Sequence, residues 1–163
     1  MKPQPFPHGN INPGVQCGID FPSWIGDCCG MGLVTTMVRL GNPRKPELGS
    51  LERKAMADSG ALHLCIPASL AQELELESGQ KRKVATADGK SHECDYVGPI
   101  TLTVCGRECF TGAIVIGDEV LLGAVPMEDM DLWISPAQHR LVPNPASPDI
   151  PLSVAKGLRV LRD

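Results

Sequence analysis

The stretch KAMADSGALHLCIP, residues 54–67, places an Asp-Ser-Gly tripeptide between two apolar runs. The patterns of 51–57 and 61–66 predict strands on both sides of it. An acid between two buried strands costs free energy unless it is solvated or hydrogen-bonded, and this cost is accepted mainly at functional sites. The small neighbours Ser59 and Gly60 would let backbone amides and a hydroxyl approach the carboxylate. Asp58 is therefore the first candidate for a functional residue.

Outward from this stretch, most of the sequence is typical of short strands and turns. The 17 glycines and 15 prolines favour turns over long helices. A helix is predicted over 68–76, with Leu70, Ala71 and Leu74 on one face and Gly79 as its stop signal. A second short helix is predicted to open at Pro126, with Glu128 and Asp129 near its positive end. Further strands are predicted at 33–40, 100–104, 109–116 and 120–123, with a hairpin at Asp88-Gly89 and a pairing of 132–134 with 140–142.

The 163 residues suit one domain with a hydrophobic core. We expect residues 1–30, which are rich in proline and lack periodicity, to form a poorly ordered N-terminal extension. The mainly β domain is predicted to span 31–143, and 144–163 is predicted to be a Pro-rich C-terminal tail.

Charge and hydropathy patterns exclude several function classes. The net charge of −4 gives no electrostatic reason to expect nucleic-acid binding. No apolar run approaches the length of about 20 residues that a membrane-spanning helix needs. The N-terminal residues lack the apolar segment of a signal peptide, so we expect a cytoplasmic protein.

The seven cysteines stand at positions 17, 28, 29, 65, 94, 105 and 109. In a reducing compartment they are expected to be thiols, and their spacing favours small buried side chains over metal ligands. Cys105 and Cys109 could face each other across a hairpin. We therefore expect no metal, and a structural domain with a regulatory cysteine cluster near the N-terminus stays open as an alternative.

Three motifs occur in an order that resembles a known family. Ala57-Asp58-Ser59-Gly60-Ala61 resembles the active-site loop of the retropepsin-like aspartic proteases, the single-lobed relatives of pepsin. TADGK, 86–90, resembles their flap hairpin, and VLLGA, 120–124, resembles the apolar-apolar-Gly segment beneath the catalytic loop. The resemblance spans 31–143, is closest to small bacterial members, and implies the acid-protease fold: a mainly β, closed barrel or sandwich of one lobe with one or two short helices.

The resemblance assigns roles to particular residues. It implies that Asp58 is catalytic and that Ser59, Gly60 and Ala61 complete the active-site loop. The implied flap is Ala87, Asp88, Gly89 and Lys90, and the implied supporting segment is Leu121, Leu122 and Gly123. Aspartic proteases need two carboxylates and this chain offers one such motif, so the resemblance implies a homodimer that cleaves a peptide or protein, without a cofactor or metal.

The sequence also departs from the family pattern and leaves alternatives open. Ser59 stands where Thr is commoner, although both carry a hydroxyl, and Ala124 stands where retroviral enzymes often have Arg. Asp58 could instead be a turn acid, and Asp118-Glu119 could form a second carboxylate pair. His63 is interpreted as a strand histidine. The main alternative function is a dimer that binds a peptide or partner in the same groove without cleaving it.

Overall fold

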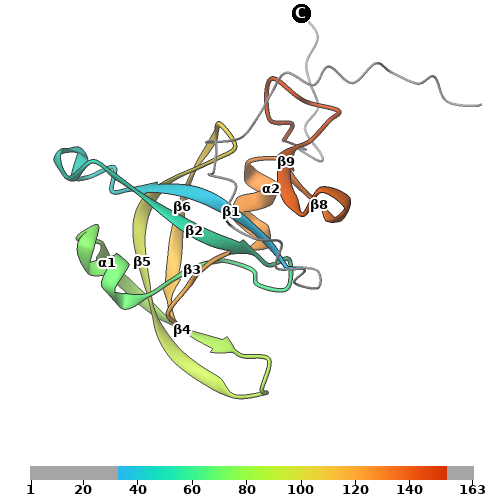
Figure 1. Ribbon diagram of the computed structural model, residues 1–163. Coiled ribbons are helices and arrows are strands. Elements are labelled where there is room, and N and C mark those ends of the chain that lie inside the picture. Colours follow the sequence, from blue (N-terminus) through green and yellow to red (C-terminus); the bar gives the residue numbers. More distant parts are fainter. Residues whose placement is uncertain (1–32, 154–163) are drawn as a thin grey trace, which may run out of the picture.

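The computed structural model describes residues 33–153 and shows a mainly β protein, a closed mixed barrel of six strands with two short α-helices (Figure 1). The predicted fold class is thereby confirmed. The N-terminal extension predicted for 1–30, the cysteines within it and the end of the predicted tail from 154 onward lie outside the described residues. None of the helices in residues 33–153 is long and apolar enough to cross a membrane.

The strands of the barrel follow one another in the order β1-β2-β7-β3-β6-β5, and β5 pairs again with β1 to close the ring. Pairing is antiparallel except for β2 with β7 and β3 with β6, which are parallel. The six strands are β1 (Val34–Gly41), β2 (Ser50–Ala57), β3 (Leu64–Ile66), β5 (Ser91–Val104), β6 (Arg107–Val115) and β7 (Val120–Leu122). A further strand, β4 (Glu77–Ala85), pairs with β5 alone, so that β4 and β5 form an arm that leaves the barrel (Figure 1).

Alternating side chains fill the barrel. In β1, Val38 and Leu40 are buried, whereas Met37 before Val38 and Arg39 between the two are exposed. In β5, the buried Ile100, Leu102 and Val104 alternate in the same way with half-buried threonines. Since side chains of a strand point to opposite faces with a period of two, this pattern gives each strand one apolar face for the core. Met127 and Met130 also belong to the core.

The two α-helices are shorter than predicted and lie in slightly different places. α1 spans Ala68–Glu73, and Glu75 then takes a positive φ of 47° that ends the helical path. Gly79 is not a helix stop but lies within β4. α2 spans Ala124–Asp129 with Gly123 as its N-cap, so Pro126 is its third residue. Glu128 and Asp129 consequently lie at the C-terminal end of α2, not near its positive end as predicted.

Two strand predictions and the prediction for Cys105 and Cys109 are also corrected. β3 covers only Leu64–Ile66, since 61–63 remain in the loop that approaches β7. β5 is one strand of 14 residues that continues through the cis Gly98-Pro99 bond and a bulge. Cys105 lies in the two-residue turn after β5, where it and Gly106 have positive φ, whereas Cys109 pairs with Leu102 and is buried. The two cysteines therefore do not face each other across the hairpin.

β8 (Leu132–Ser135) and β9 (Arg140–Pro143) form the predicted pair as a separate two-stranded sheet. The short 3₁₀ turns are Pro46–Leu48 and Pro136–Gln138.

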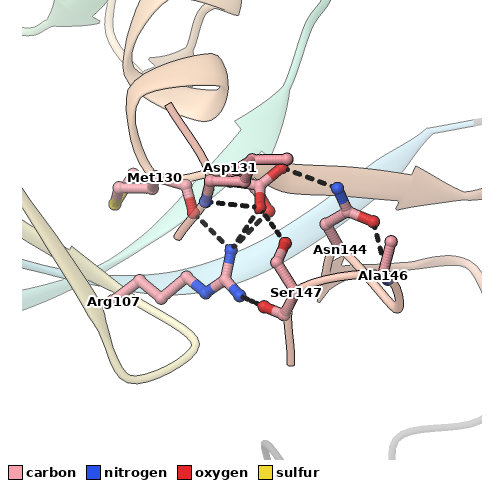
Figure 2. Close-up of polar contacts among 7 residues, drawn as sticks. Arg107, Met130, Asp131, Asn144, Ala146 and Ser147 are labelled. Carbon is pink, nitrogen blue, oxygen red and sulfur yellow. Dashed lines mark hydrogen bonds and ion pairs between the residues drawn. The ribbon is translucent and has the colours of Figure 1, made fainter. Parts of the chain in front are cut away.

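A polar network joins the chain beyond the barrel to β6 (Figure 2). The Arg107 guanidinium, in a side chain only 6% exposed, donates to the carbonyls of Met130, Asp131 and Ser147. The Asp131 carboxylate accepts hydrogen bonds from Asn144, Ser147 and the Leu152 amide. The first ten residues of the predicted tail are thus anchored to the domain at several points.

Candidate active site

The candidate active-site loop runs from Asp58 to His63, between the end of β2 and the start of β3. The Asp58 N–H donates to the carbonyl of Leu122 at 3.0 Å, which continues the pairing of β2 with β7. The Asp58 carboxylate accepts a hydrogen bond of 2.8 Å from the Gly60 N–H, and the Asp58 carbonyl accepts one of 3.2 Å from Ala61. These bonds form a tight turn in which Asp58 is half-buried while Ser59 and Gly60 are exposed.

The predicted supporting segment lies directly against this loop. β7 is inserted between β2 and β3, so Leu121 pairs both with Met56 and with Cys65. A Cβ on Gly123 would stand 2.4 Å from the His63 carbonyl oxygen and 2.8 Å from that of Ala61. The next amides, of Ala124 and Val125, donate to the carbonyls of Ala61 and Leu62 at 2.8 and 3.0 Å. Glycine is needed here because two backbone segments approach more closely than a side chain would allow.

The predicted flap is the tip of the arm formed by β4 and β5. The Thr86 N–H donates to the Lys90 carbonyl and the Gly89 N–H to that of Thr86, both at 2.9 Å, and Gly89 has a φ of +78°. The Asp88 carboxylate accepts hydrogen bonds from the Thr86 hydroxyl and the Lys90 N–H, which hold the pKa of Asp88 below its usual range. The hairpin predicted at Asp88-Gly89 is confirmed. A hollow of about 630 Å³ beside the tip is lined by Thr86, Ala87, Asp88, His92, Glu93, Cys94 and Ile116.

A small apolar cluster outside the main core connects the arm to the barrel. It contains the buried Cys65, Cys94 and Ile114, with Val84, Tyr96, Ile116 and Leu121 packed against them. Burial raises the pKa of the Cys65 thiol, and the charges of Cys94 and Asp58 raise it further. The cluster lies next to the candidate active-site loop, because its Leu121 pairs with Cys65 and precedes Leu122, whose carbonyl accepts the hydrogen bond from the Asp58 N–H.

The structure therefore brings two of the three predicted motifs, the Asp58 loop and the Leu121-Gly123 segment, into direct contact, and it places the third on the arm. In the described residues Asp58 has no ion-pair partner. Asp118 and Glu119 are exposed between β6 and β7 and line a different hollow, together with residues of β1, β2 and α1. Asp58 does not line that hollow, and a function for the Asp118-Glu119 pair stays a prediction.

A second group of polar side chains near this loop was not predicted. His63, at the end of the loop, lies 2.8 Å from a guanidinium nitrogen of Arg82 on β4. The Arg82 guanidinium carbon lies 3.8 Å from the ring centroid of Tyr96 on β5, and the rings of Tyr96 and His63 meet edge to face. Burial lowers the pKa of His63, and the charge of Arg82 lowers it further. No sequence signal joins these residues, because they come from three separate elements.

These contacts define the class of the molecule, a closed mixed β-barrel with a glycine-supported acidic loop and a projecting hairpin arm. No model of a protein family matches the chain, and no curated protein matches it either.

Proposed function

We propose that the protein is a retropepsin-like aspartic endopeptidase that acts as a homodimer, with Asp58 of each subunit at the shared site. The observation that carries the proposal is the placement of Asp58 at the end of β2, in a turn held against the inserted strand β7. The acid thus sits on a backbone fixed from both sides, while small exposed residues follow it. This arrangement supports the motif resemblance, since the glycine segment lies beneath the acidic loop as the resemblance implies.

The chemistry requires a second carboxyl group. Two carboxyl groups about 3 Å apart cannot both ionise, so such a pair holds one proton between them. The ionised group takes a proton from a water molecule, whose oxygen attacks the scissile carbonyl carbon, while the protonated group donates to the carbonyl oxygen. Collapse of the tetrahedral intermediate then breaks the C–N bond. The group that took the water's proton gives it to the leaving nitrogen, and a hydroxyl of the intermediate returns its proton to the other carboxylate, so the pair again holds one proton. Since one chain supplies one Asp-Ser-Gly motif, two-fold symmetry is the simplest source of the second carboxyl.

The arm would serve as the flap of this site. Its tip, Ala87 to Lys90, is an exposed turn held by its own hydrogen bonds, and the hollow beside it is lined partly by Cys94 and Ile116. In the proposal the arm covers an extended peptide, the apolar cluster around Cys65 and Leu121 forms one wall of the cleft, and the Ser59 hydroxyl hydrogen-bonds across the dimer beneath the carboxylates. The alternative is a dimer of the same fold that binds a peptide without cleaving it.

The test is a cleavage screen on a diverse peptide library between pH 4 and 7, with the wild type, Asp58→Asn and the matched control Asp118→Asn. We expect the wild type and Asp118→Asn to cleave and Asp58→Asn to lose cleavage by at least about 10³-fold. The specific activity should rise with protein concentration below the dimer dissociation constant, because the monomer is incomplete. Peptide binding without cleavage by a folded wild-type dimer would refute the proposal and favour the binding alternative.

A further inference from the structure

A groove of about 660 Å³ begins at the far end of the candidate active-site loop. His63 of that loop and Val125 of α2 line one part of it, and the Val125 N–H donates to the Leu62 carbonyl. Phe110 and Val125, which both line the groove, are 69% and 42% exposed, so their apolar surfaces are open to a bound molecule. The exposed ion pair of Arg44 and Glu77 also lines the groove.

One cation beside this groove is held in place without a carboxylate partner. Arg39, Arg44, Arg53 and Arg107 each form an ion pair, whereas no carboxylate lies within ion-pair distance of Arg82 in residues 33–153. The Arg82 guanidinium is instead positioned by His63 and by the face of Tyr96, both of which line the groove. A guanidinium fixed in this way loses little conformational freedom when it binds an anion.

The glycine at position 112 makes the arrangement possible. A Cβ at Gly112 would stand 2.4 Å from the Tyr96 Cζ and Oη atoms, so the absence of a side chain lets the Tyr96 ring lie across β6. Tyr96 in that position carries Arg82 on its ring and meets His63 with its edge. The orientation of the cation therefore depends on Gly112.

The backbone beside the groove fits an extended peptide. β6 pairs with β3 only at Ala113, Ile114 and Val115. In the described chain, the part of that strand edge formed by Phe110, Thr111 and Gly112 has no strand partner. All three residues line the groove. An unpaired strand edge beside exposed apolar side chains is a mode by which proteins bind extended peptides.

We propose that this groove binds an extended segment of the peptide substrate and holds one of its Glu or Asp side chains against the Arg82 guanidinium. The carboxylate would form charge-assisted hydrogen bonds with Arg82, while neighbouring apolar residues of the peptide contact Phe110 and Val125. This inference deepens the proposed function, because the groove begins where the candidate active-site loop ends and would select substrates with an acidic residue to one side of the scissile bond.

The test measures binding, so it does not depend on catalysis. The full chain carrying Asp58→Asn is titrated by fluorescence polarisation with two fluorescein-labelled nonapeptide pools. One pool has Glu at the central position, the other has Gln, and both draw the flanking positions from Ala, Val, Leu, Phe and Thr. We expect the Glu pool to bind about ten-fold more tightly than the Gln pool in 0.15 M salt.

Three variants in the same Asp58→Asn background locate the preference. Arg82→Gln should abolish it. Lys83→Gln makes the same charge change on the next residue of β4 and should retain the preference. Arg82 pairs with Cys94 and Lys83 with Glu93, so the two side chains lie on opposite faces of the sheet. Gly112→Ala, which displaces the Tyr96 ring without changing any charge, should reduce the preference several-fold.

Equal binding of the Glu and Gln pools to the Asp58→Asn protein would overturn the inference. So would an equal loss of the Glu preference in Arg82→Gln and Lys83→Gln, or a Glu preference that Gly112→Ala leaves undiminished. These outcomes are separable from failure of the proposed function. Cleavage by the wild type with no Glu preference refutes the groove assignment alone, whereas an Arg82-dependent preference without cleavage refutes the protease assignment alone.

Discussion

Replacing Gly123 by alanine tests whether β7 supports the candidate active-site loop. The new Cβ would stand 2.4 Å from the His63 carbonyl oxygen, a backbone atom that cannot rotate away, so the loop or β7 has to move. Such overpacking costs about 1–3 kcal/mol. The hydrogen bonds from the Ala124 and Val125 amides to the loop would be strained as well, and each contributes about 1 kcal/mol. We expect Gly123→Ala to lose about 2–4 kcal/mol of stability, which for a chain of this length lowers Tm by roughly 10 °C.

The assay is thermal unfolding followed by circular dichroism, with Gly41→Ala as the matched control. Gly41 also lies in the barrel, but a Cβ there would meet its nearest atoms at 3.8 Å, an ordinary contact. Its Tm should therefore stay within about 2 °C of the wild type. If the Tm of Gly123→Ala were as high as that of Gly41→Ala, the close approach of the loop to β7 would not exist in solution, and the geometric support for Asp58 would be lost.

The polar network of Figure 2 gives two further predictions. Arg107→Met should lower the free energy of unfolding by about 2–4 kcal/mol in urea titrations, because the carbonyls to which Arg107 donates hydrogen bonds lose their donor. An unchanged urea midpoint would contradict this. The Ser147 hydroxyl, together with the Leu152 amide and Asn144, lowers the pKa of Asp131 to about 2. The ionised Asp131 therefore stabilises the folded protein at pH values above its unfolded-state pKa near 4, and this stabilisation is lost as the pH falls through about 2. Asp131→Asn should therefore flatten the dependence of Tm on pH in this range, and equal slopes in the two proteins would refute the assignment.

The location of the strands and turns could be predicted from the sequence because both are local properties. The β-branched residues of 33–40 and the alternation of apolar and polar residues in 100–104 can both be recognised without knowledge of distant residues. The Asp88-Gly89 hairpin was predictable for the same reason, since glycine adopts the positive φ found there. The ends of the helices were less predictable. The helix predicted to open at Pro126 begins at Ala124 because the amides there are drawn to the carbonyls of the loop.

For the candidate site, the sequence identified the Asp58 loop, the hairpin tip and the Leu121-Gly123 segment as separate motifs. Their functional roles stay predictions, as does the domain boundary at Pro143. The group of His63, Arg82 and Tyr96 could not be predicted, because its contacts join a loop to two strands of the arm and no spacing along the chain encodes them.

The sequence by itself determined that the protein is mainly β, which faces of its strands are apolar and where its turns fall, since these follow from side-chain periodicity and backbone preferences over a few residues. Only the tertiary structure decided that β7 enters between β2 and β3, that the ring closes through β1 and β5, and that Gly123 meets the Asp58 loop. Those pairings join segments far apart in the chain, and their free energy comes from burying both partners together, which no local pattern records.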